Sequence, residues 1–204
     1  PYVDELESKI EDLTGVKHCV SVGNATDAME IIFKFLNLPR ESKVLVPSHT
    51  MLATASAVRN ANLKPIPIDV DINTLMLEIE QLKNFNLDNV SGCMVTQLNG
   101  VVADMNPIKD FCKRNNIALV EDSAQGIGAF NGNKHAGSWG IGGCLSFYPA
   151  KVAGGIGDGG ALITNNDLLA DYARSVRDHG RGEKFEAINW GRNSRLDSIN
   201  ARVV

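Results

Sequence analysis

The hydrophobic positions at the start of the chain follow the period of a helix and then form an extended apolar run. Between residues 2 and 14 an apolar side chain recurs every three or four positions, and Gly15 follows as a typical helix-ending residue. Residues 18–22 are mostly apolar without that spacing. We therefore predict a helix over residues 2–14 and a short strand over residues 18–22.

The same alternation continues along the chain. Helices are predicted at 26–36, 51–62, 78–85, 105–115 and 167–178, and strands at 43–46, 64–70, 93–97, 117–120, 144–148 and 161–164. The run 117–120 is apolar throughout, as is typical of a strand buried on both faces. This order predicts an α/β fold with a mostly parallel central sheet between helices. Ligands of such folds bind beyond the carboxyl ends of the strands.

The two ends of the chain indicate a fragment. Leu196, Ile199 and Val203 keep helical spacing, and no helix-ending residue follows them. The chain begins at Pro1, with neither an initiator methionine nor a signal segment. We expect residues 1–204 to be one large domain truncated at both ends.

Composition excludes several classes of protein. The chain has 204 residues, of which 44% are hydrophobic and 22% charged, and its formal net charge is −4. These values are typical of a soluble globular domain. No apolar run approaches the roughly 20 residues of a membrane span, and the acidic balance disfavours nucleic acid. Four scattered cysteines without a C-x-x-C pair indicate no metal site and no disulfide, and favour a cytoplasmic protein.

Glycine is concentrated in one window of the sequence. Twelve of the 19 glycines lie between Gly126 and Gly160, where only Lys134, Lys151 and Asp158 carry a formal charge. Such a stretch is typical either of connecting loops or of a backbone that approaches a ligand closely.

Part of this window matches the dinucleotide-binding pattern G-x-G-x-x-G, at Gly155, Gly157 and Gly160. That fingerprint requires a helix directly after it, whereas the apolar run 161–164 predicts a strand. We therefore reject a dinucleotide site. The sequence contains no G-x-x-x-x-G-K-[ST] phosphate loop either.

Candidate ligand-binding residues follow three of the predicted strands. Asn24, Ala25 and Thr26 open a helix whose free N–H groups could bind an anion, although an ordinary helix cap also explains them. Asp122 ends a buried strand, where a carboxylate is costly unless it meets a cation. Lys151 is either an ordinary surface charge or, in an apolar site, a nucleophile toward carbonyls. A reactive lysine, an acidic partner for a ring nitrogen and an anion site are together what pyridoxal phosphate requires.

Short motifs occur in a fixed order along the whole chain. They are Thr26-Asp27-Ala28, Pro47-Ser48 through Ala53-Thr54, Ala103-Asp104-Met105, Glu121-Asp122-Ser123-Ala124-Gln125, Ser146-Phe147-Tyr148-Pro149-Ala150-Lys151, Gly157-Asp158-Gly159-Gly160, Asp178-His179-Gly180 and Asn193-Ser194-Arg195-Leu196. In this order the motifs resemble those of the DegT/StrS-type sugar aminotransferases, which are pyridoxal phosphate enzymes of the aspartate aminotransferase fold (fold type I). The resemblance implies that residues 1–204 are the cofactor-binding large domain and that a C-terminal small domain is absent.

The resemblance also implies which residues contact the cofactor ring. Lys151 would form a Schiff base with pyridoxal 5'-phosphate and then shuttle protons. Asp122 would keep the ring nitrogen protonated, since a nearby opposite charge favours the charged form. Gln125 would lie beside the ring. Met51 stands where the family commonly has a stacking aromatic residue, and its sulfur can still pack on the ring.

A second set of implied roles concerns the phosphate. Thr26, the N–H groups around Ala25, and Ser146 resemble the family's phosphate ligands. Asn193 resembles a residue that reaches the phosphate in a partner subunit, which implies a homodimer with shared active sites. The family often has Ser-Gly where Asn24 and Ala25 stand, so the backbone turn before the helix is less free here.

The implied reaction is the transamination of a nucleotide-linked keto-deoxysugar with an amino acid donor, usually glutamate, in aminosugar and surface polysaccharide biosynthesis. Lysine at position 151 favours amino transfer over the related dehydratases, which carry histidine there. A pyridoxal phosphate dehydratase or lyase on the same scaffold, and a non-catalytic regulatory protein that binds the cofactor, remain alternatives. The sequence leaves open whether His49 touches substrate and whether Arg192 and Arg195 bind substrate or form salt bridges.

Overall fold

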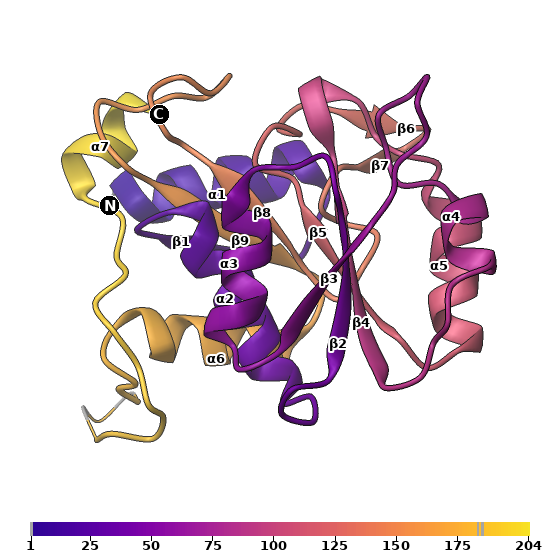
Figure 1. Cartoon of the computed structure of the whole chain (residues 1–204). Helices are drawn as coiled ribbons and strands as arrows, with labels where there is room; N and C mark the ends of the chain where they lie inside the picture. Colours follow the sequence, from indigo (N-terminus) through magenta and orange to yellow (C-terminus); the bar gives the residue numbers. More distant parts are fainter. Residues whose placement is uncertain (1, 183, 185) are drawn as a thin grey trace.

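The computed structural model describes residues 2–182, 184 and 186–204. The fold is built around one seven-stranded sheet (Figure 1). Its strand order is β1 (His18–Val22), β9 (Gly160–Thr164), β8 (Gly143–Ser146), β5 (Ala118–Asp122), β4 (Val90–Thr96), β2 (Lys43–Pro47) and β3 (Lys64–Ile68). Only β9 runs antiparallel to its neighbours, and the other six strands share one direction. The predicted mostly parallel sheet is therefore confirmed.

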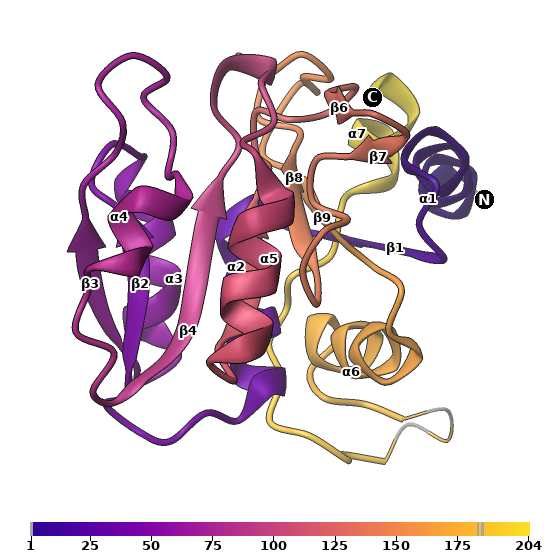
Figure 2. The ribbon, with the colours of Figure 1, turned by 90° about the vertical axis from the view of Figure 1, so that its right-hand side faces the viewer.

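Helices cover both faces of this sheet (Figure 2). One layer contains α2 (Ala25–Leu36), α3 (Leu52–Asn60) and α6 (Asp167–Arg177). The opposite layer contains α1 (Tyr2–Thr14), α4 (Ile79–Lys83), α5 (Met105–Arg114) and α7 (Ser198–Val203). This arrangement confirms the predicted alternation of helices and strands as an α/β fold.

Alternate side chains of each central strand enter different cores. In β2, Val44 and Val46 pack toward α2 and α3, whereas Leu45 packs on the other face among the residues around α5. In β5, Val120 and Leu119 divide in the same way. Each such side chain contributes about 1.5–3 kcal/mol when it leaves water. The sheet is thus buried on both faces, as the apolar run in β5 predicts.

Helix α2 begins at the carboxyl edge of the sheet because Asn24 caps it. Asn24 has an extended backbone, and its Oδ1 accepts a hydrogen bond from the Asp27 N–H at 2.8 Å. The helix therefore starts at Ala25, one residue before the prediction. It ends at Leu36, because the next residue, Asn37, adopts the left-handed conformation.

Several boundaries and small elements differ from the sequence prediction. Helix α3 begins after Met51, β4 starts earlier than predicted, and α4 is shorter. Two elements were not predicted: the 3-10 turn η1 (Leu98–Gly100) and the hairpin of β6 (Phe130–Asn131) with β7 (Lys134–His135). The four cysteines are buried and free. In the described part of the chain, no helix is long and apolar enough to span a membrane.

Candidate active site

A cavity of about 460 Å³ opens beyond the carboxyl ends of β1, β4, β5 and β8, as expected for an open α/β sheet. Residues that follow those strands, the start of α3 and the turn before β9 form its walls. Seven of the eight residues proposed from the sequence line it, namely Ala25, Thr26, Met51, Asp122, Gln125, Ser146 and Lys151. Asn193 does not line the cavity.

Lys151 lies in the turn that follows β8. Its backbone N–H donates a hydrogen bond to the Tyr148 carbonyl at 2.8 Å, and its side chain is half-buried. Within the described residues, its ammonium group has no hydrogen-bond or ion-pair partner. A second hollow of about 340 Å³, lined by Asn99 and Gln125 among others, also reaches Lys151. Lys151 therefore borders both the main cavity and this adjoining hollow.

Asp122 ends β5 and is only 4% exposed. Its Oδ2 accepts a hydrogen bond from Thr54 Oγ1 at 2.6 Å, and its Oδ1 accepts one from the Ala124 N–H at 3.2 Å. The Cys144 thiol also donates a weak hydrogen bond to Oδ1 at 3.5 Å. Burial and the Asp122 carboxylate raise the pKa of this thiol well above its usual range, so it remains protonated. No cation pairs with Asp122 in the described part of the chain. This buried carboxylate can therefore accept a cationic ligand from the cavity.

The start of α2 forms the anion-binding end of the cavity. The N–H groups of Ala25 and Thr26 lie in the first helical turn and have no acceptor within the helix. The nearby Asp27 carboxylate is occupied by Arg192, at 2.9 Å, and by the Ser194 hydroxyl, at 2.6 Å. Because these partners neutralise and orient Asp27, its repulsion of an anion at the helix start is reduced.

Three other predicted residues occupy separate parts of the wall. Gln125 Oε1 accepts a hydrogen bond from the backbone N–H of Asn99 at 2.9 Å, which fixes this side chain against η1. Ser146 Oγ, at the end of β8, accepts a hydrogen bond from the Tyr148 N–H at 3.3 Å. Met51 precedes α3 and is 71% exposed, so it lies at the mouth of the cavity.

Asn200 of α7 fixes the glycine turn behind Lys151, a role that the sequence did not reveal. It is 4% exposed, and its Oδ1 accepts a hydrogen bond from the Ile156 N–H at 2.9 Å. Its Nδ2 donates to the carbonyls of Gly157, at 3.3 Å, and Asp158, at 2.9 Å. Asp158 lines the cavity, so α7 holds one of its walls.

Glu121, which precedes Asp122 in β5, is a buried carboxylate that accepts four hydrogen bonds. Its carboxylate accepts hydrogen bonds from Gln97 Nε2 and from the backbone N–H groups of Gly137, Trp139 and Gly140, at 2.6–3.0 Å. The pKa of the Glu121 carboxyl is raised overall, because the effect of burial is larger than the opposing effect of the four hydrogen bonds. These hydrogen bonds join β5 to the loop 137–140 and thereby support the strand that carries Asp122.

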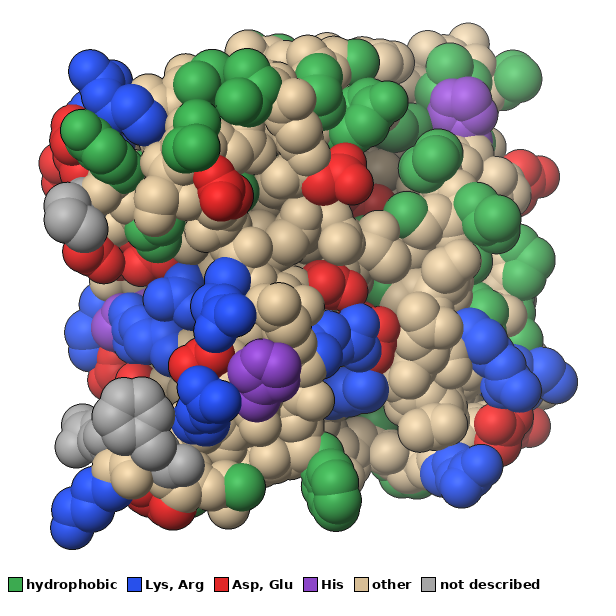
Figure 3. All heavy atoms as spheres, turned by 90° about the vertical axis from the view of Figure 1, so that its left-hand side faces the viewer, with side chains coloured by type: hydrophobic (Ala, Val, Ile, Leu, Met, Phe, Trp, Pro, Cys, Tyr) green, Lys and Arg blue, Asp and Glu red, His purple; other side chains and the backbone are tan. Residues whose placement is uncertain are grey.

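The remaining polar candidates lie outside the cavity. His49 and His179 are exposed, and neither lines it. Arg195 pairs with Asp178, so this arginine forms an intramolecular salt bridge. Asn193 is exposed next to these groups. Figure 3 shows Lys and Arg side chains mixed with carboxylates across the middle of one face of the molecule.

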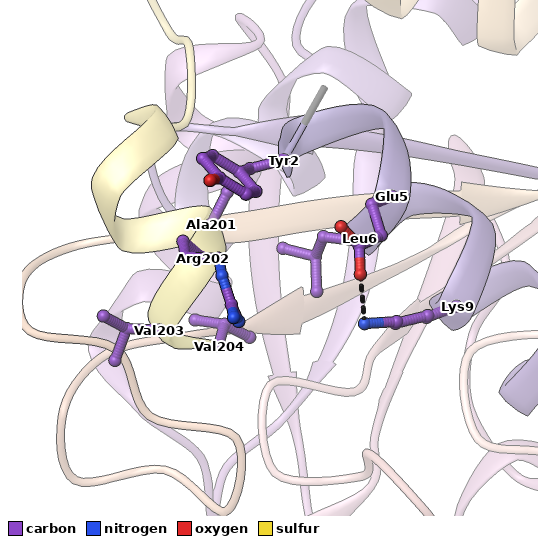
Figure 4. A pocket seen from close by; sticks show the side chains of 8 residues that line it. All are labelled: Tyr2, Glu5, Leu6, Lys9, Ala201, Arg202, Val203 and Val204. Carbon is purple, nitrogen blue, oxygen red and sulfur yellow. Dashed lines mark hydrogen bonds and ion pairs between the residues drawn. The ribbon is translucent and has the colours of Figure 1, made fainter.

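A smaller hollow of about 160 Å³ lies between α1 and α7, close to both ends of the chain (Figures 1 and 4). Its polar groups are already paired. Glu5 and Lys9 form an ion pair at 2.6 Å, and the Arg202 guanidinium lies 5.7 Å from the centre of the Tyr2 ring. The groups suited to cofactor chemistry are gathered in the larger cavity instead.

The fold and the cavity together define a class: an α/β protein of the type I pyridoxal phosphate fold, with a lysine, a buried carboxylate and a helix N-terminus at one sheet edge. Residues 1–204 match the model of the DegT/DnrJ/EryC1/StrS aminotransferase family. The chain belongs to this family, which confirms both the resemblance and the fold class predicted from the sequence.

Three relatives illustrate the match. UDP-2-acetamido-2-deoxy-3-oxo-D-glucuronate aminotransferase of Pseudomonas aeruginosa is 34% identical over 100% of this chain and 57% of its own length. A DegT DnrJ EryC1 StrS aminotransferase from Brucella abortus is 36% identical, with a TM-score of 0.95 over 100% of this chain and 57% of that one. The structure of ntda from Bacillus subtilis with bound cofactor PMP is 27% identical, with a TM-score of 0.91 over 100% and 46%. The chain thus spans about half the length of its relatives.

Proposed function

We propose that this chain is the cofactor-binding part of a longer, homodimeric, cytoplasmic enzyme. In this proposal the enzyme uses pyridoxal 5'-phosphate to move an amino group from an amino acid, glutamate, to a nucleotide-linked keto-deoxysugar in aminosugar or surface polysaccharide biosynthesis. One observation carries the proposal. Lys151 and Asp122 line the same cavity, and the N-terminus of α2 forms one of its walls.

The residues present fit the cofactor. Asp122 is a buried carboxylate without a cation among the described residues, and a protonated ring nitrogen would supply one. The first N–H groups of α2, with Thr26 and Ser146, suit a phosphate group. The Lys151 amine suits the aldehyde. When bound, pyridoxal phosphate supplies an electron sink for the carbon that loses or gains a proton.

The residues of the chain would divide the remaining work. Lys151 Nζ would bind the cofactor covalently and, once a substrate amine has displaced it, carry a proton between substrate and cofactor carbons. Asp122 would hold the ring nitrogen by an ion pair and a hydrogen bond. Met51 would cover one ring face, and Gln125, fixed by Asn99, would orient the ring from its edge.

Three observations support a partner subunit. Asn193 is exposed, and its neighbours Arg192 and Ser194 both bind Asp27, so the segment presents Asn193 to the outside in a fixed place. Met51 and Tyr148 at the cavity mouth are 71% and 53% exposed. Hydrophobic side chains also gather along the upper edge of the face in Figure 3, on the side of the strands' carboxyl ends. A second copy would cover these groups and bring its own Asn193 to the phosphate.

The covalent step is tested by borohydride trapping in the full-length protein. Incubation with pyridoxal phosphate followed by reduction should label Lys151, identified by peptide mass spectrometry. Lys151→Ala should abolish the specific label, whereas Lys64→Ala, on β3 outside the cavity, should leave it unchanged. A label that survives in Lys151→Ala would refute the assignment.

The type of reaction is tested by product analysis. The purified full-length protein is incubated with glutamate and a panel of nucleotide keto-sugars, and 2-oxoglutarate is measured. We expect 2-oxoglutarate and an aminated sugar in equal amounts. Loss of the sugar substrate without 2-oxoglutarate would favour the dehydratase or lyase. Trapping at Lys151 without turnover of any sugar would favour the regulatory protein.

A further inference from the structure

Three threonines form a continuous chain of hydroxyl groups that ends on the Asp122 carboxylate. Thr54 Oγ1 lies 2.6 Å from Asp122 Oδ2, Thr50 Oγ1 lies 2.7 Å from Thr54 Oγ1, and Thr96 Oγ1 lies 3.1 Å from Thr50 Oγ1. They come from α3, from the loop before it and from the end of β4. Three separate elements therefore converge on this carboxylate.

The chemistry of Asp122 gives this chain a direction. An ionised carboxylate only accepts hydrogen bonds, so the Thr54 hydroxyl must use its single proton on Asp122. The Thr54 oxygen then accepts from Thr50, and the Thr50 oxygen accepts from Thr96. Every donor in the series points toward Asp122, and bonds aligned in this way strengthen one another.

Burial protects this arrangement from water. Thr54 is 0% exposed and Thr96 is 5% exposed, whereas Thr50 between them is half-buried, so water has least access to the hydrogen bond between Thr54 and Asp122. Thr50 and Thr96 also line the cavity beside Asp122. The hydroxyl chain therefore lies directly between the core and the space that a ligand would occupy.

Packing alone does not require these hydroxyl groups. A valine at position 54 would be nearly the same size and would bury no polar atom, but it would leave the Asp122 carboxylate without its shortest hydrogen bond. The hydroxyl instead makes a hydrogen bond to a charged group, which is about twice as strong as a bond between neutral groups. The other contacts of the carboxylate, from the Ala124 N–H at 3.2 Å and the Cys144 thiol at 3.5 Å, are longer and weaker.

We propose that Thr54 is a positioning residue that, backed by Thr50 and Thr96, fixes the orientation of the Asp122 carboxylate toward a protonated ring nitrogen in the cavity. This inference rests on the proposed function for the identity of the ligand. The orientation of Asp122 itself can be examined without any ligand, which keeps the two claims separable.

The test compares Thr54→Val, which removes the hydroxyl, with Thr54→Ser, which keeps it. The dissociation constant of pyridoxal phosphate is measured on the full-length protein from the absorbance of the bound cofactor. We expect Thr54→Val to raise the dissociation constant roughly tenfold, as the loss of one charge-assisted hydrogen bond predicts. Thr54→Ser should stay within about threefold of the natural protein.

A matched control separates positioning from general destabilisation. Thr14 is also a buried helical threonine, 5% exposed, whose hydroxyl donates to the Ile10 carbonyl at 2.6 Å far from the cavity. Thr14→Val should leave cofactor affinity unchanged. Natural affinity in Thr54→Val, or equal losses in the Val and Ser variants, would overturn the proposal, since either result shows that the hydroxyl does not matter.

Crystal structures of the cofactor-free variants supply the second measurement. We expect Asp122 to change its side-chain rotamer in Thr54→Val and to keep it in Thr54→Ser. An unchanged Asp122 rotamer in Thr54→Val would overturn the positioning role. Failure of the proposed function would instead appear as the absence of a label on Lys151 in the natural protein, and the rotamer comparison would still judge Thr54.

Discussion

Asn200 occupies the space that a side chain on Gly155 would need. A Cβ atom built on Gly155 would lie 2.0 Å from Asn200 Oδ1, far inside contact distance. Asn200 is held in place by three hydrogen bonds to the backbone of residues 156–158. The absence of a side chain at Gly155 is therefore what allows α7 to close on the turn behind Lys151.

This relationship predicts the effect of the smallest possible substitution. Gly155→Ala should displace Asn200, lower the free energy of unfolding by about 1–3 kcal/mol and slow the borohydride trapping of Lys151. Urea unfolding and timed labelling measure the two effects. Gly157→Ala is the matched control, because a Cβ there meets no atom within 4 Å. Equal behaviour of the two variants would show that the Asn200 contact does not hold the turn.

The charge of Asp122 should matter more than its shape. Asp122→Asn keeps the volume and can still accept a hydrogen bond from Thr54, but it removes the negative charge that the proposed function pairs with the ring nitrogen. A hydrogen bond to a charged group is worth about 1.5–3 kcal/mol, so we expect cofactor affinity to fall roughly ten- to a hundredfold. Titration of the bound cofactor's absorbance gives the answer. An affinity equal to that of the natural protein would contradict the assigned role.

Glu121→Gln should destabilise the fold even though the two side chains have the same shape. Each oxygen of Glu121 accepts two N–H donors, so the amide of glutamine must face two donors in either orientation. We expect the free energy of unfolding to fall by about 1–3 kcal/mol. Urea unfolding at neutral pH measures it. Unchanged stability would mean that the loop 137–140 can move away from β5 at no cost.

His135 should make stability depend on pH. Its Nε2 accepts a hydrogen bond from the Gly128 N–H at 2.9 Å, its Nδ1 contacts the Ala136 carbonyl, and burial lowers its pKa. The unfolded chain therefore takes up the proton first as pH falls. The stabilisation is complete above the unfolded pKa of about 6.5 and is lost as pH falls through the folded value.

The measurement is urea unfolding across pH 5–8 on the natural protein and on His135→Gln, which does not titrate there. We expect the slope of unfolding free energy against pH in this window to be smaller in the variant. The same slope in both proteins would show that other groups cause the dependence.

Asn193 can be tested by mixing two inactive variants. If each active site takes Lys151 from one subunit and Asn193 from its partner, a mixed dimer of Lys151→Ala and Asn193→Ala contains one intact site. Random exchange of subunits should then restore about one quarter of the natural transaminase activity. The separate variants provide the baseline, and size-exclusion chromatography checks dimer formation. Mixed dimers without activity above that baseline would rule out shared sites.

Local pattern was sufficient to predict the main elements and some of the residues around the cavity, whereas Met51, Gln125 and Ser146 followed from the resemblance to the family. Polar residues directly after apolar runs stand out in a sequence, and parallel strands bring their carboxyl ends to one edge. Asp122 and Lys151 were found in this way. The helix start at Thr26 was found too, although Asn24 turned out to be its cap and shifted the boundary by one residue.

The supporting contacts could not be predicted because they join distant parts of the chain. Thr54 lies 68 positions from Asp122, and Asn200 lies 44 positions from Ile156. Nothing in the local sequence distinguishes Thr54 from an ordinary helical threonine, or Asn200 from a surface asparagine. Arg192 is a similar case, since only the fold shows that it pairs with Asp27.

The antiparallel course of β9 has a consequence for how this cavity can vary. Because β8 and β9 are adjacent and antiparallel, the loop 147–159 leaves the sheet at the end of β8 and returns to it next to that strand. Hydrogen bonds between Phe147 and residues 155 and 159 close this loop. The side chains of Val152 and Ile156 project from this loop and are 84% and 68% exposed. Both side chains point into solvent, and Val152 borders the adjoining hollow beside Lys151, so the rim of that hollow can vary in size while the loop backbone that carries Lys151 stays in place.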